Sequence, residues 1–250
     1  MTKTKTLALG AVGLVSLLLL WEGFARSGAV QSTLIPAPSA VPAAWMSEWD
    51  LGFWQDMVAA SFSHYAVGLL IGSFLGVCIG VAVALMPRVN ASQAWIVRIV
   101  RPIPPLAWIP FAIIWFGVSE TAAAFIISIG IFWINYFAAL TAVQSVDKDL
   151  IEVARAFGHH SAIGRLFKVI LPAASPGILG GLRTGLGQGW MTVIAAELFG
   201  IPGIGQRMIE ASGLLATDVV VLYMLTIGAL YGITDYIFML AQNRLLAWQK

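Results

Sequence analysis

The sequence predicts an all-α membrane protein that forms a single domain over residues 1–250 and crosses the bilayer about six times. Hydrophobic residues make up 59% of the 250-residue chain and charged residues only 10%, and the mean hydropathy is +0.88. A soluble domain carries about 25% charged residues and could not bury so much apolar surface. The composition therefore excludes a soluble enzyme, a disordered chain and a nucleic-acid-binding protein.

Six apolar segments approach the length of about 20 residues that a spanning helix needs. The first resembles a secretory signal but has no small-residue cleavage site after Trp21, so we expect a retained helix. The third contains four prolines, which predict an irregular backbone. The expected spans are residues 6–25, 65–86, 94–116, 122–143, 176–198 and 219–241.

Lysine and arginine are concentrated on one side of this arrangement. With both termini on the same side, twelve of the 14 basic residues fall on or near that face, and only Arg26 and Arg207 fall opposite. Loops rich in lysine and arginine remain cytoplasmic. We therefore predict a multi-pass protein of the cell inner (cytoplasmic) membrane with both termini in the cytoplasm.

Two of the expected spans carry glycines at every fourth residue, which places them on one face of a helix. Such stripes let a second backbone approach closely, because lipid provides no hydrophobic drive for helix association. We predict helix packing for both stripes, with pore lining as the alternative. They consist of Gly68, Gly72, Gly76 and Gly80, and of Gly181, Gly185 and Gly189.

Three charged residues fall within or close to the ends of spans, where ionisable side chains are costly and usually functional. Arg183 could line an anion path or extend its guanidinium to the cytoplasmic interface. Glu197 could cap a helix or form an ion pair at the outer mouth. Asp235 lies inside the last span. The sequence contains no phosphate-binding loop and no catalytic serine or metalloprotease motif.

The three histidines give no reason to expect intramembrane catalysis or a metal site. His64, His159 and His160 all fall outside the expected spans. Adjacent histidines also point apart, which is a poor geometry for one metal ion. We therefore expect no catalytic residue, no metal and no cofactor in this chain.

The polar segment 144–172 predicts two short helices outside the membrane. Asp149 and Glu152 resemble a capping box, and Leu150, Ile151, Ala154 and Phe157 form one apolar face. Gly158 should end the first helix. Ser161 should cap the second, with Pro172 beyond its end. An amphipathic helix pair of this kind is suited to dock into a groove of a partner protein.

In this segment the sequence resembles the EAA loop of ABC importer permeases, at Glu152-Val-Ala154, Gly158 and Val169-Ile-Leu171-Pro172. In that family the loop is the coupling helix that docks on the ATP-hydrolysing subunit. Two further stretches, 101–117 and 181–198, resemble the subfamily that serves taurine, aliphatic sulfonates, nitrate and bicarbonate. The stretch 212–220 looks closest to its taurine branch.

This resemblance implies an all-helical type I ABC importer fold and a non-catalytic permease subunit. It further implies a second copy of the chain, two ATP-binding subunits that hold ATP and magnesium, and an extracytoplasmic binding protein that delivers a sulfonate-type ligand, taurine first. A nitrate or bicarbonate importer is the alternative. An ion-coupled secondary carrier that uses Glu197 and Asp235 is the more distant one.

The predicted site residues fall into two groups. We expect the ATPase subunit to dock on Glu152, Ala154, Gly158, Leu171 and Pro172. We expect the translocation path to involve Pro104, Trp108, Arg183, Gln188, Trp190 and Glu197.

Overall fold

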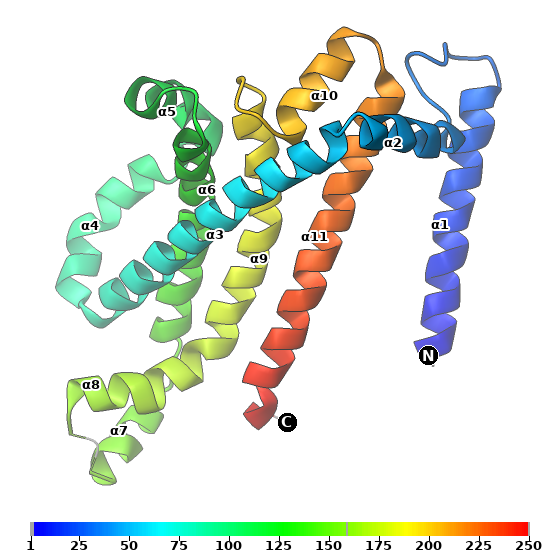
Figure 1. The fold of residues 1–250 in the computed structure, drawn as a ribbon. Helices are drawn as coiled ribbons and strands as arrows, with labels where there is room; N and C mark the ends of the chain where they lie inside the picture. The colour runs from blue at the N-terminus through cyan, green and yellow to red at the C-terminus, as the bar shows by residue number, and fades with distance from the viewer. Residues whose placement is uncertain (1–2, 159, 250) are drawn as a thin grey trace.

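The computed structural model describes residues 3–158 and 160–249, and every regular element in these ranges is a helix (Figure 1). Short 3-10 turns cover Pro38–Ala40, Pro105–Trp108 and Ala247–Gln249, and a π turn covers Leu166–Ile170. The α-helices are α1 (Lys3–Arg26), α2 (Val41–Asp50), α3 (Phe53–Leu85), α4 (Pro87–Val100), α5 (Ile109–Phe116), α6 (Glu120–Gln144), α7 (Lys148–Ala156), α8 (Ala162–Arg165), α9 (Leu171–Glu197), α10 (Ile204–Gly213) and α11 (Thr217–Leu245).

Five long helices are apolar enough to cross a membrane, and a bent pair supplies a sixth crossing. The five are α1, α3, α6, the run from α8 to α9, and α11. In the bent pair, α4 and the segment Pro105–Phe116 meet at an angle of 86°. Pro104 has the extended backbone that a residue before a proline prefers, so the helix is interrupted there. The six crossings, with a broken third, agree with the expectation from the sequence.

Helix α3 is longer than the second span expected from the sequence, residues 65–86. Helix α3 begins at Phe53 rather than near Tyr65, directly after Gly52 in a left-handed conformation. At about 1.5 Å per residue, its 33 residues extend roughly 50 Å, well beyond a hydrocarbon core of about 30 Å. Helix α3 therefore crosses the other helices obliquely (Figure 1). As a result, His64 lies inside this helix and not in a loop before it.

Helix α6 is the centre of the fold, with α3 and α9 packed on it. The two glycine stripes make these contacts possible. A Cβ atom at Gly72 would lie 2.6 Å from the carbonyl oxygen of Ser128, and one at Gly189 would lie 3.1 Å from Ile131 Cδ1. Both stripes therefore serve helix packing, as predicted. The backbone of α6 comes too close to the first stripe for a side chain, and side chains of α3 and α6 fill the space over the second.

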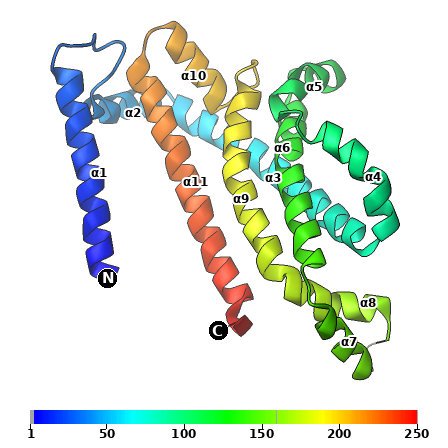
Figure 2. The same cartoon turned by 180° about the vertical axis from the view of Figure 1, so that it is seen from behind.

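Helix α1 stands apart from the other spans (Figures 1 and 2). Polar contacts tie the C-terminal end of α1 to the 3-10 turn Pro38–Ala40. Glu22 accepts a hydrogen bond from the backbone amide of Ser39 at 3.1 Å, and Arg26 donates to the Ser39 hydroxyl at 3.0 Å. The start of α1 and the end of α11 lie toward the end of the molecule that carries α7 and α8 (Figure 1).

Candidate functional site

Helices α7 and α8, between α6 and α9, lie at one end of the molecule, beyond the end of α6 (Figure 1). Asp147 begins α7, because its carboxylate accepts a hydrogen bond from the Asp149 amide at 2.9 Å. The expected cap at Asp149 was therefore two residues too late. Gly158, after the end of α7, has a φ of +88°, a conformation that favours glycine. Ser161 caps α8, as expected, by accepting from the Gly164 amide at 3.4 Å.

The single apolar face expected for α7 is in fact divided between two sides. Ile151 and Ala154 pack inward under the ends of α6 and α9, and Ala154 is only 7% exposed. Other apolar side chains of α7, of the residue that follows it, of α8 and of the π turn Leu166–Ile170 remain exposed. We call this set the terminal apolar patch: Leu150, Val153, Phe157, Ile163 and Phe167.

The predicted docking residues lie around this patch at different depths. Glu152 and Gly158 are exposed, whereas Leu171 is half-buried against the core under α6. Pro172 does not lie beyond a helix end, because the π turn Leu166–Ile170 joins α8 directly to α9. A proline is tolerated there, since the first turn of a helix does not require its N–H group.

The predicted path residues do not form one cluster. Pro104 is exposed and Trp108 half-buried at the bend between α4 and α5. The neighbouring Pro105 packs close to Gly130 and Thr192, and Thr192 accepts a hydrogen bond from Gln188 at 3.3 Å. The structure therefore brings the proline bend next to Gln188.

Trp190 belongs to the core. It is 2% exposed, stacks on Tyr65 with ring centroids 4.4 Å apart, and donates its indole N–H to Thr234 at 3.4 Å. It therefore ties α9 to α3 and α11.

Arg183 and Asp235 form a bidentate ion pair between α9 and α11. The Arg183 Nε and Nη2 atoms donate to the two Asp235 oxygens at 2.7 and 2.8 Å. Charges at membrane depth are commonly paired in this way. The sequence left two roles open for Arg183: it could line an anion path, or it could extend its guanidinium to the cytoplasmic interface. In the structure the guanidinium is instead paired with Asp235.

Glu197 is fully buried at the junction of α3, α9 and α10. One carboxylate oxygen accepts from the Ser61 hydroxyl at 2.9 Å and the Gly205 amide at 2.8 Å, and the other lies 3.0 Å from His64 Nδ1. His64, which we expected outside the spans, lies within the long helix α3. Ser61 and His64 were missed, although their spacing of three residues puts both on one helix face.

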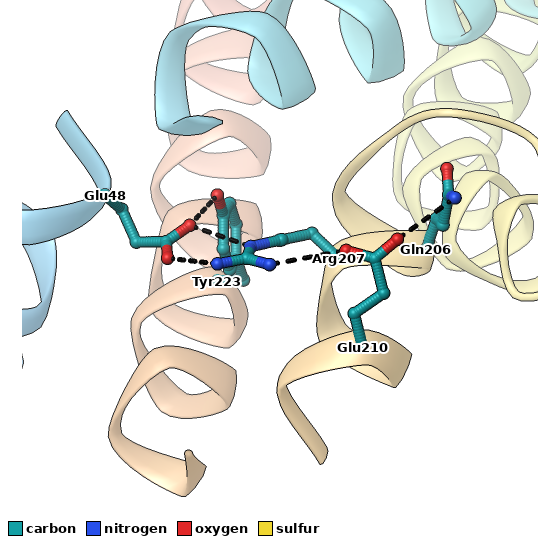
Figure 3. A network of polar contacts seen from close by, with 5 residues as sticks. All are labelled: Glu48, Gln206, Arg207, Glu210 and Tyr223. Carbon is teal, nitrogen blue, oxygen red and sulfur yellow. Dashed lines mark hydrogen bonds and ion pairs between the residues drawn. The ribbon is translucent and has the colours of Figure 1, made fainter. Parts of the chain in front are cut away.

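A second polar network joins α2, α10 and α11 at the end of the molecule opposite α7 (Figures 1 and 3). Glu48 accepts two hydrogen bonds from Arg207, one of them at 2.6 Å, and one from the Tyr223 hydroxyl at 2.8 Å. Arg207 also contacts Glu210 at 3.3 Å and lies over the Phe53 ring. The network anchors the short helix α2 to α10 and to the spanning helix α11.

This network changes the ionisation of its charged groups. Burial opposes ionisation of Glu48, but the hydrogen bonds from Arg207 and Tyr223 and the charge of Arg207 outweigh it, so the pKa of Glu48 falls below its ordinary value. The hydrogen bonds to Glu48 raise the pKa of Arg207 against the effect of burial. Both groups are therefore charged at neutral pH.

The chain matches the family described as "Binding-protein-dependent transport system inner membrane component" over residues 68–248. It is 34% identical to the taurine transport system permease protein TauC of Escherichia coli K12, over 99% of this chain and 91% of TauC. It is 31% identical to the putative aliphatic sulfonates transport permease protein SsuC of Bacillus subtilis, over 92% of this chain and 84% of that protein. It is also 31% identical to the bicarbonate transport system permease protein CmpB of Synechococcus elongatus, over 98% and 89%.

Two solved structures share the fold. A chain of the MetNI methionine ABC transporter superposes with a TM-score of 0.60 at 22% identity, covering 79% of this chain and 97% of that one. A chain of an amino acid ABC transporter gives 0.55 at 18% identity, covering 79% and 94%. From the family match, the near full-length relatives and the shared fold, the chain belongs to the inner-membrane permeases of binding-protein-dependent ABC importers.

Proposed function

We propose that this permease carries a small sulfonate-type anion or zwitterion, taurine first, from an extracytoplasmic binding protein across the inner membrane. Two copies of the chain would enclose the path, and two ATP-hydrolysing subunits would bind below. The relatives named for taurine and for aliphatic sulfonates support this cargo. The relative named for bicarbonate supports the alternative of a bicarbonate importer, and a nitrate importer remains the other alternative from the sequence.

The terminal apolar patch is the observation that carries the ATPase assignment. Phe157 is 82% exposed and lies outside the helices that are long and apolar enough to span a membrane. Large exposed apolar groups of this kind mark interaction surfaces. The patch would dock on the ATPase subunit together with Glu152 and Gly158. Because the start of α1 and the end of α11 lie toward the same end, this placement supports cytoplasmic termini (Figure 1).

The mechanism follows from the continuity of the chain above the patch. The π turn Leu166–Ile170 joins α8 to α9 without an intervening loop, and α9 packs on the central helix α6. Closure of the ATPase pair would move α7 and α8 as a lever, and the lever would tilt α9. The permease would thereby alternate between inward and outward access. The ligand and the nucleotide must bind the two states with different affinities to drive this change.

The test is Phe157→Glu in the complete transporter. We expect loss of co-purification with the ATPase subunit and loss of ATP-driven taurine uptake into proteoliposomes. Leu214→Glu is the matched control, because Leu214 is 76% exposed but lies beyond α10 at the opposite end. If Phe157→Glu co-purifies with the ATPase subunit as well as the control does, the docking assignment is wrong.

The cargo and the energy source need separate measurements. Excess unlabelled taurine should abolish labelled taurine uptake, whereas nitrate and bicarbonate should leave it unchanged. Uptake should stop on ATP depletion and survive an uncoupler. The opposite result would favour the secondary carrier, for which the pairing of Asp235 with Arg183 leaves no free carboxylate at that position.

A further inference from the structure

A polar cavity of about 250 Å³ lies between α4 and the second half of α6. Residues 90, 93, 94, 97, 98 and 101 line one side of it, and positions three or four apart share one face of a helix. Its polar side chains are Asn90, Gln93, Arg98, Arg101 and Tyr136. None of the residues that line the cavity is acidic, so it combines cationic with neutral polar groups.

The two arginines of the cavity carry permanent positive charges that no carboxylate balances. Arginine stays protonated in proteins. Among the residues that the structure describes, no carboxylate oxygen lies within 4.0 Å of the guanidinium nitrogens of Arg98 or Arg101. Arg183 and Arg207, by contrast, each pair with a carboxylate. Because Arg98 and Arg101 are both exposed, an anionic ligand can reach them.

Aromatic rings hold both guanidinium groups in place. The Cζ atom of Arg98 lies 4.9 Å from the centroid of the Trp95 ring, and that of Arg101 lies 4.3 Å from the centroid of the Phe137 ring. These contacts use the charge of the guanidinium and leave its N–H groups available as donors. Neither group donates a hydrogen bond within the described part of the chain. Two sets of donors in one cavity suit a ligand with several acceptor oxygens, such as a phosphate or a sulfonate.

The cavity lies close to one face of the membrane. Tyr136 and Leu140, which line it, precede the end of α6 at Gln144 by eight and four residues. The cavity is therefore about 6–12 Å from that end of the helix. Helix α3 ends near the same level, since Gly80 in its last turns packs on Tyr136. Helices α7 and α8 lie beyond this end (Figure 1), so the cavity is at the border between lipid headgroups and acyl chains.

An apolar surface adjoins this cationic cavity. Trp95, the ring beside Arg98, is 70% exposed, and Ile96 and Ile99 on the same helix are 64% and 70% exposed. Tryptophan is typical of the level of the lipid headgroups. A ligand at this place therefore meets fixed cations and apolar side chains within about one helical turn. A small soluble anion would use only the cations, whereas a phospholipid offers a phosphate to the arginines and acyl chains to the apolar surface.

We propose that the cavity binds the phosphate group of an anionic phospholipid, in the leaflet on the side of α7 and α8. The phosphate oxygens would accept hydrogen bonds from Arg98 and Arg101, and Asn90 would contact the rest of the headgroup. Basic cavities between membrane helices commonly hold anionic headgroups. The bound lipid would connect α4 to α6 where the broken third crossing begins. This inference does not depend on the identity of the cargo.

The test is thermal unfolding of the full-length permease in a nonionic detergent during titration with a short-chain lipid. The probes are dioctanoyl-phosphatidylglycerol, which is anionic, and dioctanoyl-phosphatidylcholine, which is zwitterionic. A ligand that binds the folded state raises the melting temperature, and we expect only the anionic lipid to do so. Its apparent affinity should fall about fivefold in Arg98→Gln and again in Arg101→Gln, the factor for one basic residue near an anionic surface. Arg88→Gln is the matched control, because Arg88 is exposed on α4 but does not line the cavity.

Three results would overturn the proposal. The first is equal stabilisation of the unmodified chain by the two lipids, and the second is an equal loss of affinity in Arg88→Gln and in the cavity variants. The third is stabilisation by taurine that disappears in Arg98→Gln and Arg101→Gln, because the cavity would then belong to the path of the cargo. Either single variant decides the question if the other fails to fold.

Discussion

The close approach of α3 and α6 predicts a large effect from one added methyl group at Gly76. A Cβ atom there would lie 2.7 Å from the carbonyl oxygen of Phe132, 3.0 Å from Asn135 Cβ and 3.1 Å from the Tyr136 amide nitrogen. Ordinary contacts to a Cβ atom are 3.4–4 Å. Two of the three neighbours are backbone atoms of α6, so no side-chain rotation relieves the clash. The two helices would have to separate by roughly 0.7 Å.

Overpacking of this kind costs about 1–3 kcal/mol of unfolding free energy. An alanine also favours the helix over a glycine by about 1 kcal/mol, which partly hides the cost. Gly228→Ala in α11 isolates the helix effect, because a Cβ atom at Gly228 has no neighbour within 4 Å. The two variants should therefore differ by about 1–3 kcal/mol, with Gly76→Ala the less stable.

The assay is thermal unfolding of the purified permease in detergent, followed by fluorescence. For a chain of this size, each kcal/mol shifts the midpoint by about 2–4 °C. Gly76→Ala should melt several degrees below Gly228→Ala. If it melts at the same temperature or higher, α3 and α6 are not in contact through the glycine stripe.

Three further predictions concern the polar pairs. Because the pKa of Glu48 is lowered, its carboxylate stabilises the fold at neutral pH, and this contribution is lost as the pH falls below about 4.5. The melting temperature of the unmodified chain should therefore fall more steeply between about pH 5 and 3 than that of the Glu48→Gln variant. Equal slopes for the two proteins would contradict the pairing of Glu48 with Arg207. Tyr223→Phe removes one hydrogen bond to Glu48 and should cost about 0.5–1.5 kcal/mol of unfolding free energy in a denaturant titration, whereas no change would show that the hydroxyl is not bound. Arg183→Leu should lower the free energy of unfolding, because it leaves Asp235 without its charged partner. The double variant with Asp235→Leu should recover most of that loss, and additive losses in the double-mutant cycle would refute the ion pair.

The features that repeat along one helix could be predicted from the sequence. The glycines of α3 and α9 recur every four residues, so their common face and their packing role followed from helix geometry alone. The prolines before and within 105–110 predicted the broken third span, since proline lacks the N–H group that continues a helix. Ser161 was identified as a cap from its position before a short amphipathic run.

The start of α3 could not be predicted in the same way. The hydropathy pattern marks only the part of a helix that lies in lipid, and the first turns of α3 are amphipathic. The helix begins where Gly52 adopts a left-handed conformation, which the sequence does not specify. The earlier start has a consequence, because it places His64 within α3 rather than in a loop before it.

The sequence by itself determined the class of protein and the number of crossings, because bilayer thickness sets how long an apolar run must be. It also predicted two short helices between two of the long apolar ones, and the structure contains them as α7 and α8. Only the tertiary structure decided which ionisable groups meet. Glu197 and His64 are 133 residues apart, Arg207 and Glu48 are 159 apart, and Arg183 and Asp235 are 52 apart. No periodicity within one helix reports such pairs, because they depend on how separate helices pack around α6.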